Sequence, residues 1–378
     1  MVLHAPDVVL LAPGFLGFSR FGNFYYFTDR VVATLRGIIE EALDRSIPVV
    51  PCMTLPTDSL AHRQRFLLEY IAKIVDTRLA SVARIHLVGH STGGVDVQLL
   101  ACDAALGGVA WSADAERLRA RIASVVTISA PHHGTGLANG DLARFGENPF
   151  KHPTAIIPLA KTLVRLGALL PREVVALAGL QVACPNDLLE FLLQVVRSRD
   201  LIGDLRPDRM ADVRRDAAPD PRIPVTCFVT ATLPRSDAER PSDPFYADIY
   251  EMTAAGSVQH RSPAVVRAEA RLNDLFAQRR DILIASPTSI APTSVDLALN
   301  DGVVNAARQL LETAEVAGLV VADHADVLGH YDHRDMLIDG PPLNAGLFHS
   351  GAGFGDDQFF LLYRRVAAAI LKAIRDRS

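Results

Sequence analysis

The feature that most constrains the fold is a short glycine-rich segment, residues 89–94 (GHSTGG), between two hydrophobic stretches. The apolar run 85–88 before it predicts a β-strand, and residues 93–106 after it predict a helix. A direct turn from strand to helix is tight, so the residues two before and two after the serine must be small. Glycine stands at both positions. The pattern therefore predicts a strand–turn–helix unit that exposes Ser91 at the edge of a sheet.

Short apolar runs and amphipathic stretches alternate along the chain around this unit. Such alternation is typical of βαβ units and a parallel sheet. The predicted strands are 8–11, 47–50, 85–88, 125–129, 225–229 and 319–322. The predicted helices are 29–45, one capped by Thr57 or Asp58, 93–106 and the closing 359–374. The sequence thus indicates an α/β fold with a mostly parallel central sheet and helices on both faces.

A long interruption follows the predicted strand at 125–129. Roughly 90 residues separate Gly136 from the strand at 225–229, far more than an ordinary connection between a helix and a strand needs. Apolar, helix-like segments fill this interval at 155–170, 174–183 and 188–196. We expect a helical cap or lid at 137–219, inserted into a core made of 1–136 and 220–378. A second stretch, 234–263, is rich in Pro, Ser, Asp and aromatic residues, and we expect it to be irregular.

A serine hydroxyl at such a turn becomes a nucleophile only if a histidine and an acid follow it in the chain. The best acid is Asp301, which we expect on a loop leaving an apolar strand at 295–299. The best base is His324, directly after the predicted strand 319–322. Strand ends on this edge are where an open α/β sheet presents its site. The sequence therefore predicts a catalytic triad of Ser91, Asp301 and His324.

Other residues near these positions could fill the same roles. His330 and His333 compete with His324 for the base, and Asp323 and Asp326 are weaker rivals for the acid. An Asp-Gly pair such as the one at 301–302 is also common in ordinary turns. Context favours Asp301 and His324, because each is placed to follow a strand.

A serine nucleophile of this kind needs two backbone N–H groups to stabilise the oxyanion of the intermediate. One is expected from Thr92, the residue after the serine. The other is expected from Phe15, in the loop 13–17 (PGFLG) that follows the opening strand. A Pro-Gly pair also occurs in plain turns, but here it comes directly after the first strand.

Composition limits the partners and cofactors. The net charge is −5 with His neutral, and no dense Lys/Arg cluster indicates nucleic acid binding. No apolar run reaches the roughly 20 residues that span a bilayer. The four cysteines form no C-x-x-C pair, so neither zinc nor redox chemistry is indicated. The first residues lack the pattern of a secretory signal, so we expect a cytoplasmic protein. Thiols in that compartment are expected to be reduced. No motif calls for a cofactor, so none is predicted.

Taken together, these segments resemble the bacterial triacylglycerol lipases of the α/β-hydrolase superfamily. The matching segments are 13–17, 89–94, 128–135, 205–211, 300–304 and 323–326, in the family's order. The chain departs from the family at Pro13, where those lipases usually have His, and at Thr92, where they often have Gln. Those lipases are also typically secreted, and many hold a structural calcium. Asp326 matches one calcium ligand position, but the others find no match, so we do not predict the metal.

The resemblance implies the α/β-hydrolase fold with an inserted lid, and a serine hydrolase that cleaves carboxylic esters of hydrophobic acyl chains. Its partners would be small-molecule or lipid esters, with contact to a lipid interface as an option. Acyl transfer and polyester depolymerisation would use the same triad. A non-catalytic lipid-binding protein is the alternative from another class.

Overall fold

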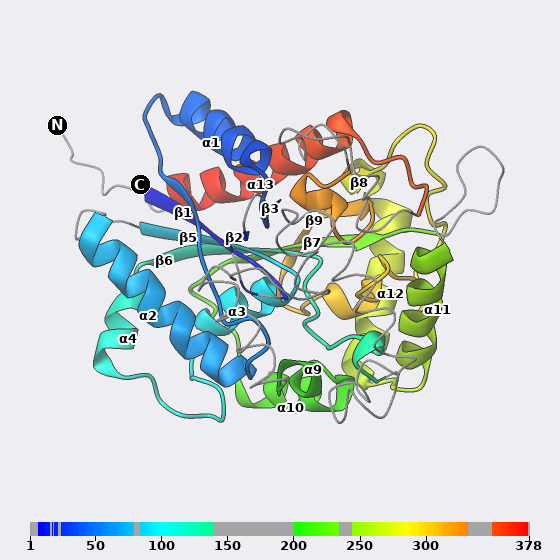
Figure 1. The fold of residues 1–378 in the computed structure, drawn as a ribbon, viewed down its shortest axis with the longest axis horizontal. Helices are drawn as coiled ribbons and strands as arrows, with labels where there is room; N and C mark the ends of the chain where they lie inside the picture. The colour runs from blue at the N-terminus through cyan, green and yellow to red at the C-terminus, as the bar shows by residue number, and fades with distance from the viewer. Residues whose placement is uncertain are drawn as a thin grey trace, which may run out of the picture.

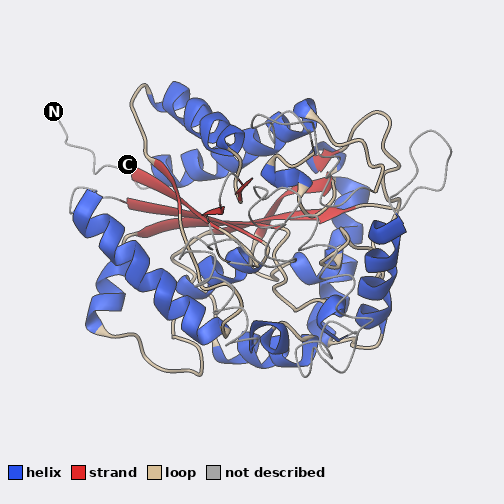
Figure 2. Cartoon of the chain, viewed as in Figure 1, coloured by secondary structure: helices blue, strands red, loops and turns tan. Residues whose placement is uncertain are grey.

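The computed structural model describes residues 7–15, 17, 19–21, 24–78, 84–139, 200–233, 244–331 and 350–376. At its centre lies a seven-stranded sheet in the order β4-β1-β5-β6-β7-β9-β8, with every neighbouring pair parallel (Figures 1 and 2). The strands are β1 (Asp7–Ala12), β4 (Val49–Pro51), β5 (Arg84–His90), β6 (Ile122–Ile128), β7 (Val225–Ala231), β8 (Leu283–Ile284) and β9 (Glu315–Val321). A small antiparallel ribbon is formed by β2 (Arg20–Phe21) and β3 (Phe24–Tyr25).

Helices cover both faces of this sheet (Figure 1). One face packs against α1 (Asp29–Leu43) and α13 (Asp356–Asp376), and the other against α2 (Leu60–Arg78), α3 (Thr92–Leu100) and α12 (Pro263–Gln278). The remaining described helices are α4 (Ala113–Arg119), α9 (Asp200–Asp204), α10 (Pro207–Asp216) and α11 (Pro244–Val258). Short 3₁₀ turns are η1 (Gly136–Asn139), η3 (Arg280–Ile282), η4 (Ala306–Gln309) and η5 (Asp326–Leu328).

The apolar strands bury side chains on both faces of the sheet. In β1, Val8 and Leu10 belong to the core beneath α2 and α12, whereas Val9 and Leu11 belong to the core beneath α1 and α13. All four side chains are fully buried. A parallel sheet covered on both faces requires such continuous apolar strands rather than alternating ones. The predicted fold class, a parallel sheet between two layers of helices, is therefore confirmed.

Several predicted boundaries shift in the structure. The second predicted helix begins at Leu60, because the Ser59 hydroxyl, not Thr57 or Asp58, accepts the His62 N–H at 3.3 Å and caps it. The helix predicted over 93–106 ends at Leu100. Beyond it, residues 101–109 form a turn in which Gly107 and Gly108 have positive φ, a conformation that a helix cannot include.

The stretch 234–263 is not wholly irregular, because α11 forms within it. Pro244 begins this helix, where a missing N–H does no harm. The helix then packs on η1, and Gly136 and Gly256 let the two backbones meet: a Cβ on Gly136 would lie 2.5 Å from the Ser257 nitrogen. Tertiary contact, which composition does not reveal, thus stabilises the helix.

Only the two ends of the predicted lid fall within the described residues. They comprise η1 at the start, and α9 and α10 at the end. Leu201, Leu205 and Met210 from this end pack with Val95 and Leu99 of α3 in one buried cluster. Residues 140–199, with the three apolar segments, lie outside the described part. The lid and the division into core and insertion stay predictions.

Candidate active site

Ser91 occupies the turn between β5 and α3, as the sequence predicts. Its backbone has φ 55° and ψ −131°, a strained conformation for a residue other than glycine. A Cβ on Gly89 would lie 2.6 Å from the Gly94 Cα, and one on Gly93 would lie 2.5 Å from the Pro13 oxygen. Both positions therefore exclude any larger residue, which is the steric demand of a nucleophile elbow.

The loop after β1 lies directly against this turn. A Cβ on Gly14 would come within 2.7 Å of the Ser91 Cβ, so glycine lets the loop approach the serine. The Gly14 carbonyl accepts the Gly17 N–H at 3.1 Å and the Arg63 guanidinium at 3.5 Å. The next peptide N–H is that of Phe15, and in a trans peptide it points opposite to the Gly14 carbonyl. The predicted oxyanion loop thus stands beside the predicted nucleophile.

A buried ion pair supports both the loop after β1 and the helix α3 that follows Ser91. Arg63 of α2 contacts Asp96 of α3 through Nε at 3.2 Å and Nη2 at 2.5 Å, and both side chains are fully buried. The same Nη2 lies 3.4 Å from the Thr92 hydroxyl. Burial raises the pKa of Asp96, and the Arg63 guanidinium opposes that rise. The pair ties α2 to the first turn of α3, where the N-terminal end of the helix dipole faces the serine.

The side chains of Asp301 and His324, the predicted acid and base, are in contact. Their side chains are joined between Asp301 Oδ2 and His324 Nδ1 at 2.9 Å, and the His324 N–H donates to the Asp301 carbonyl at 3.0 Å. Residues 295–299, however, are not the expected strand. Asp296 accepts the N–H groups of Ala298 and Leu299, which turns the backbone, so Asp301 lies on a longer loop between β8 and β9.

Several donors surround the Asp301 carboxylate. Oδ1 accepts the N–H groups of Val303 and Val304 at 3.0 and 2.8 Å. Oδ2 accepts, besides His324, the Thr230 hydroxyl at 2.5 Å and the Gln309 amide at 3.4 Å. This is the environment of an ionised carboxylate, which can only accept. Thr230 and Gln309 carry no signal in the sequence, because β7 and η4 bring them here from distant segments.

Ser129 extends this network. Its hydroxyl lies 2.7 Å from Thr230 Oγ1, so the Thr230 hydroxyl is placed between the Ser129 oxygen and Asp301 Oδ2 and can donate to either. Ser129 follows β6 with φ 54°, a second strained serine next to the elbow strand. Thr230 of β7 thus links Asp301 to the residue that follows β6.

His90 connects the elbow to the histidine loop. Its Nε2 lies 2.9 Å from the His324 carbonyl, and the two rings are 4.7 Å apart between centroids. Burial lowers the pKa of His90 well below its ordinary value, and the neighbouring His324 adds to this effect. The residue that precedes Ser91 thus contacts the predicted base, at the carboxyl ends of β5 and β9.

The rival residues have other partners. The His330 Nε2 lies 3.2 Å from the Tyr26 carbonyl, and burial lowers its pKa to about 4. Asp323 accepts the Ser350 N–H, and Asp326 accepts the Asp323 N–H. Within the described residues, no hydrogen bond joins these three side chains to the His324 ring. His333 lies outside the described part.

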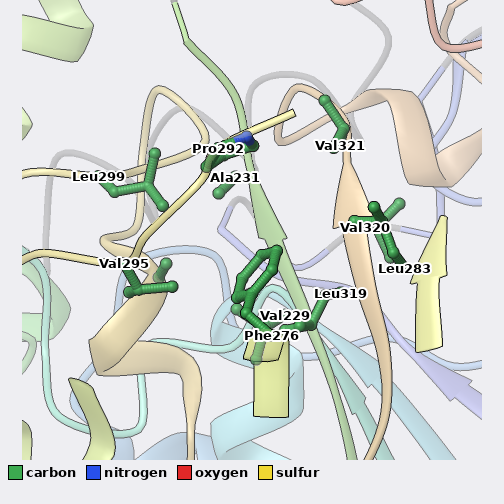
Figure 3. Close-up of a pocket in the computed structure, with 11 residues that line it drawn as sticks. Val229, Ala231, Phe276, Leu283, Pro292, Val295, Leu299, Leu319, Val320 and Val321 are labelled. Atoms are coloured by element: carbon green, nitrogen blue, oxygen red, sulfur yellow. The ribbon is translucent and has the colours of Figure 1, made fainter. Parts of the chain in front are cut away.

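Outside the candidate site, the described residues include a small cavity, three free thiols and no metal-binding cluster. A small cavity between β7, β9 and α12 is lined by hydrophobic side chains such as Val229, Phe276 and Leu319 (Figure 3). The described residues contain no group of three His, Cys, Asp or Glu side chains suited to a metal ion. Cys52, Cys102 and Cys227 are free thiols, whereas Cys184 lies outside the described residues. None of the described helices has the length and apolar character needed to cross a membrane.

No family model and no curated protein matches the chain. Among solved structures, the lipase of Staphylococcus hyicus aligns over 100% of this chain and 99% of its own, with a TM-score of 0.51 and 14% identity. Lipase 1 from Pelosinus fermentans (TM-score 0.49, 16% identity, 97% and 98% covered) and a metagenomic carboxyl esterase (0.47, 15%, 97% and 76%) are also similar. At such identities the likeness is one of fold. The chain has the α/β-hydrolase fold, as its motifs predict, in the arrangement that it shares with the S. hyicus lipase.

Proposed function

We propose that this protein is a carboxylic ester hydrolase of the lipase and esterase type, with Ser91 as its nucleophile. One observation carries the proposal: the strained elbow and the Asp301–His324 pair converge at one edge of the sheet, with His90 in contact with both. The fold shared with a lipase agrees with this reading, although a fold alone does not determine a function.

In the proposed mechanism, His324 Nε2 removes the Ser91 proton as Oγ attacks the ester carbonyl carbon. Asp301 holds His324 Nδ1–H and stabilises the imidazolium that forms. The N–H groups of Thr92 and Phe15 stabilise the oxyanion. The imidazolium then protonates the leaving alcohol, and an acyl-enzyme remains on Ser91. Water, deprotonated by His324, hydrolyses this ester and restores the serine.

We further propose that the acyl group is hydrophobic. Phe15 packs against an apolar cluster that includes Val95 and Leu99 of the elbow helix and Leu201 and Leu205. Apolar side chains thus continue from the oxyanion loop toward the end of the predicted lid. These cluster residues are buried, so the apolar side chain left to contact an acyl chain is the half-buried Phe15; the ester would be a lipid or a small molecule, with contact to a lipid interface as the extended case.

The test is hydrolysis of p-nitrophenyl esters with short, medium and long acyl chains, by the purified protein and by Ser91→Ala. We expect hydrolysis that falls by at least about 10³-fold in Ser91→Ala. A preference for long chains would indicate a lipase, and one for short chains an esterase. Ester cleavage that is equal in both proteins, or absent from the unaltered one, would contradict the proposal, and lipid binding without cleavage would then take its place.

A further inference from the structure

The hydroxyl of Tyr26 lies at the junction of three loops of the candidate site. It is 2.8 Å from His90 Nδ1, next to the nucleophile. It also lies against Gly14 of the oxyanion loop, so closely that a Cβ on Gly14 would overlap it. His90 in turn reaches the His324 carbonyl through Nε2 at 2.9 Å. Tyr26 and His90 are both buried, and their contacts connect Gly14 to the His324 carbonyl without a break.

The direction of hydrogen bonding along this chain is fixed from both ends. The His324 carbonyl can only accept, so His90 Nε2 must carry a proton. Burial, which lowers the pKa of His90 well below its ordinary value, keeps the ring neutral, so Nδ1 must accept. The Tyr26 O–H must therefore donate to Nδ1.

The surroundings of the Tyr26 oxygen agree with this direction. The Tyr26 oxygen is then left as an acceptor, and the backbone of Gly14 can supply the donor. Burial raises the pKa of the Tyr26 phenol, and a hydrogen bond from the Gly14 backbone works against that rise, as donation from the Gly14 N–H would. The hydrogen bonds thus run in one direction. The Gly14 N–H donates to the Tyr26 oxygen, the Tyr26 O–H donates to His90 Nδ1, and His90 Nε2–H donates to the His324 carbonyl.

We propose that Tyr26 is a positioning residue for the hydrolysis: by donating to His90 Nδ1 and lying against Gly14, its hydroxyl holds the oxyanion loop and the histidine loop in register with Ser91. This inference rests on the proposed function. The main chain of His324 is held on its N–H side by the Asp301 carbonyl and on its C=O side by His90. Without the Tyr26 hydroxyl, His90 Nδ1 loses its donor, so the ring can shift, weaken its Nε2–H bond to the His324 carbonyl and displace the base.

The first experiment compares Tyr26→Phe, which removes only the hydroxyl, with Tyr363→Phe. Tyr363 is as buried and donates its hydroxyl to the Val327 carbonyl at 2.7 Å, outside the Tyr26–His90 chain. Rates are expressed per active site titrated to completion with a fluorophosphonate, so misfolded protein does not count. We expect kcat to fall roughly tenfold in Tyr26→Phe with KM nearly unchanged, and to stay within about twofold in Tyr363→Phe. Equal kcat per site in Tyr26→Phe and the unaltered protein would overturn the proposal.

A second measurement reads the tautomer in the unaltered protein itself. Nitrogen-15 spectra of the histidine-labelled unaltered protein report the tautomer of each ring, and His90→Gln identifies the His90 signals. We expect His90 to carry its proton on Nε2 and to be neutral at neutral pH, because burial lowers its pKa. A proton on Nδ1, or a charged ring at neutral pH, would overturn the proposal. If the unaltered protein fails to react with the phosphonate, the proposed function fails instead, and the tautomer is still measured.

Discussion

The Ser91 side and the Asp301–His324 side of the proposed site are built by different means. Ser91 is held by backbone geometry within one continuous segment, where two glycines and a tight turn impose φ 55° on the serine. Asp301 and His324 are held by side-chain hydrogen bonds from separate segments, among them Thr230 of β7 and Gln309 of η4. One side depends on steric exclusion and the other on hydrogen bonding.

This difference implies different responses to mutation. A steric fault at the elbow affects the packing of β5 on α3, so it should lower the stability of the whole fold. A missing hydrogen bond at Asp301 affects only the orientation and charge of the imidazole, so it should lower the rate and leave the fold intact. Three pairs of substitutions test this distinction.

Asp301→Asn should have the largest effect on the rate. Two backbone N–H groups, of Val303 and Val304, hold the side-chain oxygen at the Oδ1 position, so the new NH₂ group would face His324 Nδ1. The imidazole would then keep its proton on Nε2 and could not accept the one from Ser91. We expect kcat for a p-nitrophenyl ester to fall by about 10⁴-fold, with little change in melting temperature.

Asp326→Asn is the matched control, because Asp326 is the rival acid and an amide oxygen can still accept the Asp323 N–H. Its kcat should stay within about threefold of the unaltered protein. A larger loss in Asp326→Asn than in Asp301→Asn would reassign the acid.

Gly89→Ala should break the elbow sterically. The added Cβ would lie 2.6 Å from the Gly94 Cα and could not move away, because its neighbours are backbone atoms. We expect the free energy of unfolding, measured in urea, to fall by about 3 kcal/mol. Gly37→Ala is the control, since nothing lies within 4 Å of a Cβ there in α1, and it should stabilise the protein by roughly 0.5–1 kcal/mol. Equal stability of the two variants would refute the steric account.

Thr230→Val should give a smaller loss of rate without unfolding. The change removes the hydroxyl that donates to Asp301 Oδ2 but keeps the shape of the side chain. We expect kcat to fall roughly tenfold, the value of one hydrogen bond to a charged group. Thr232→Val serves as the control, because Thr232 is also buried and its hydroxyl contacts Tyr246 rather than Asp301. If both variants lose the same activity, orientation of Asp301 by Thr230 is not the cause.

The same comparison explains how much the sequence could predict. The elbow was readable because its demands are local: small residues at fixed spacing between a strand and a helix. Asp301 and His324 were found by their place after apolar segments, although the strand expected before Asp301 is a turn made by Asp296. Thr230 and the Tyr26–His90 contact could not be found, since tertiary structure alone joins these distant positions. The helix α11 was missed for the same reason, because its packing on η1 outweighs a composition typical of loops.

The most direct test of the central claim is to identify the residue that a fluorophosphonate labels. The protein is treated with the reagent, digested, and the adduct is located by mass spectrometry. We expect one adduct, on Ser91, which is lost in Ser91→Ala and forms much more slowly in Asp301→Asn. An adduct on another residue, or undiminished labelling of Ser91→Ala, would contradict the account.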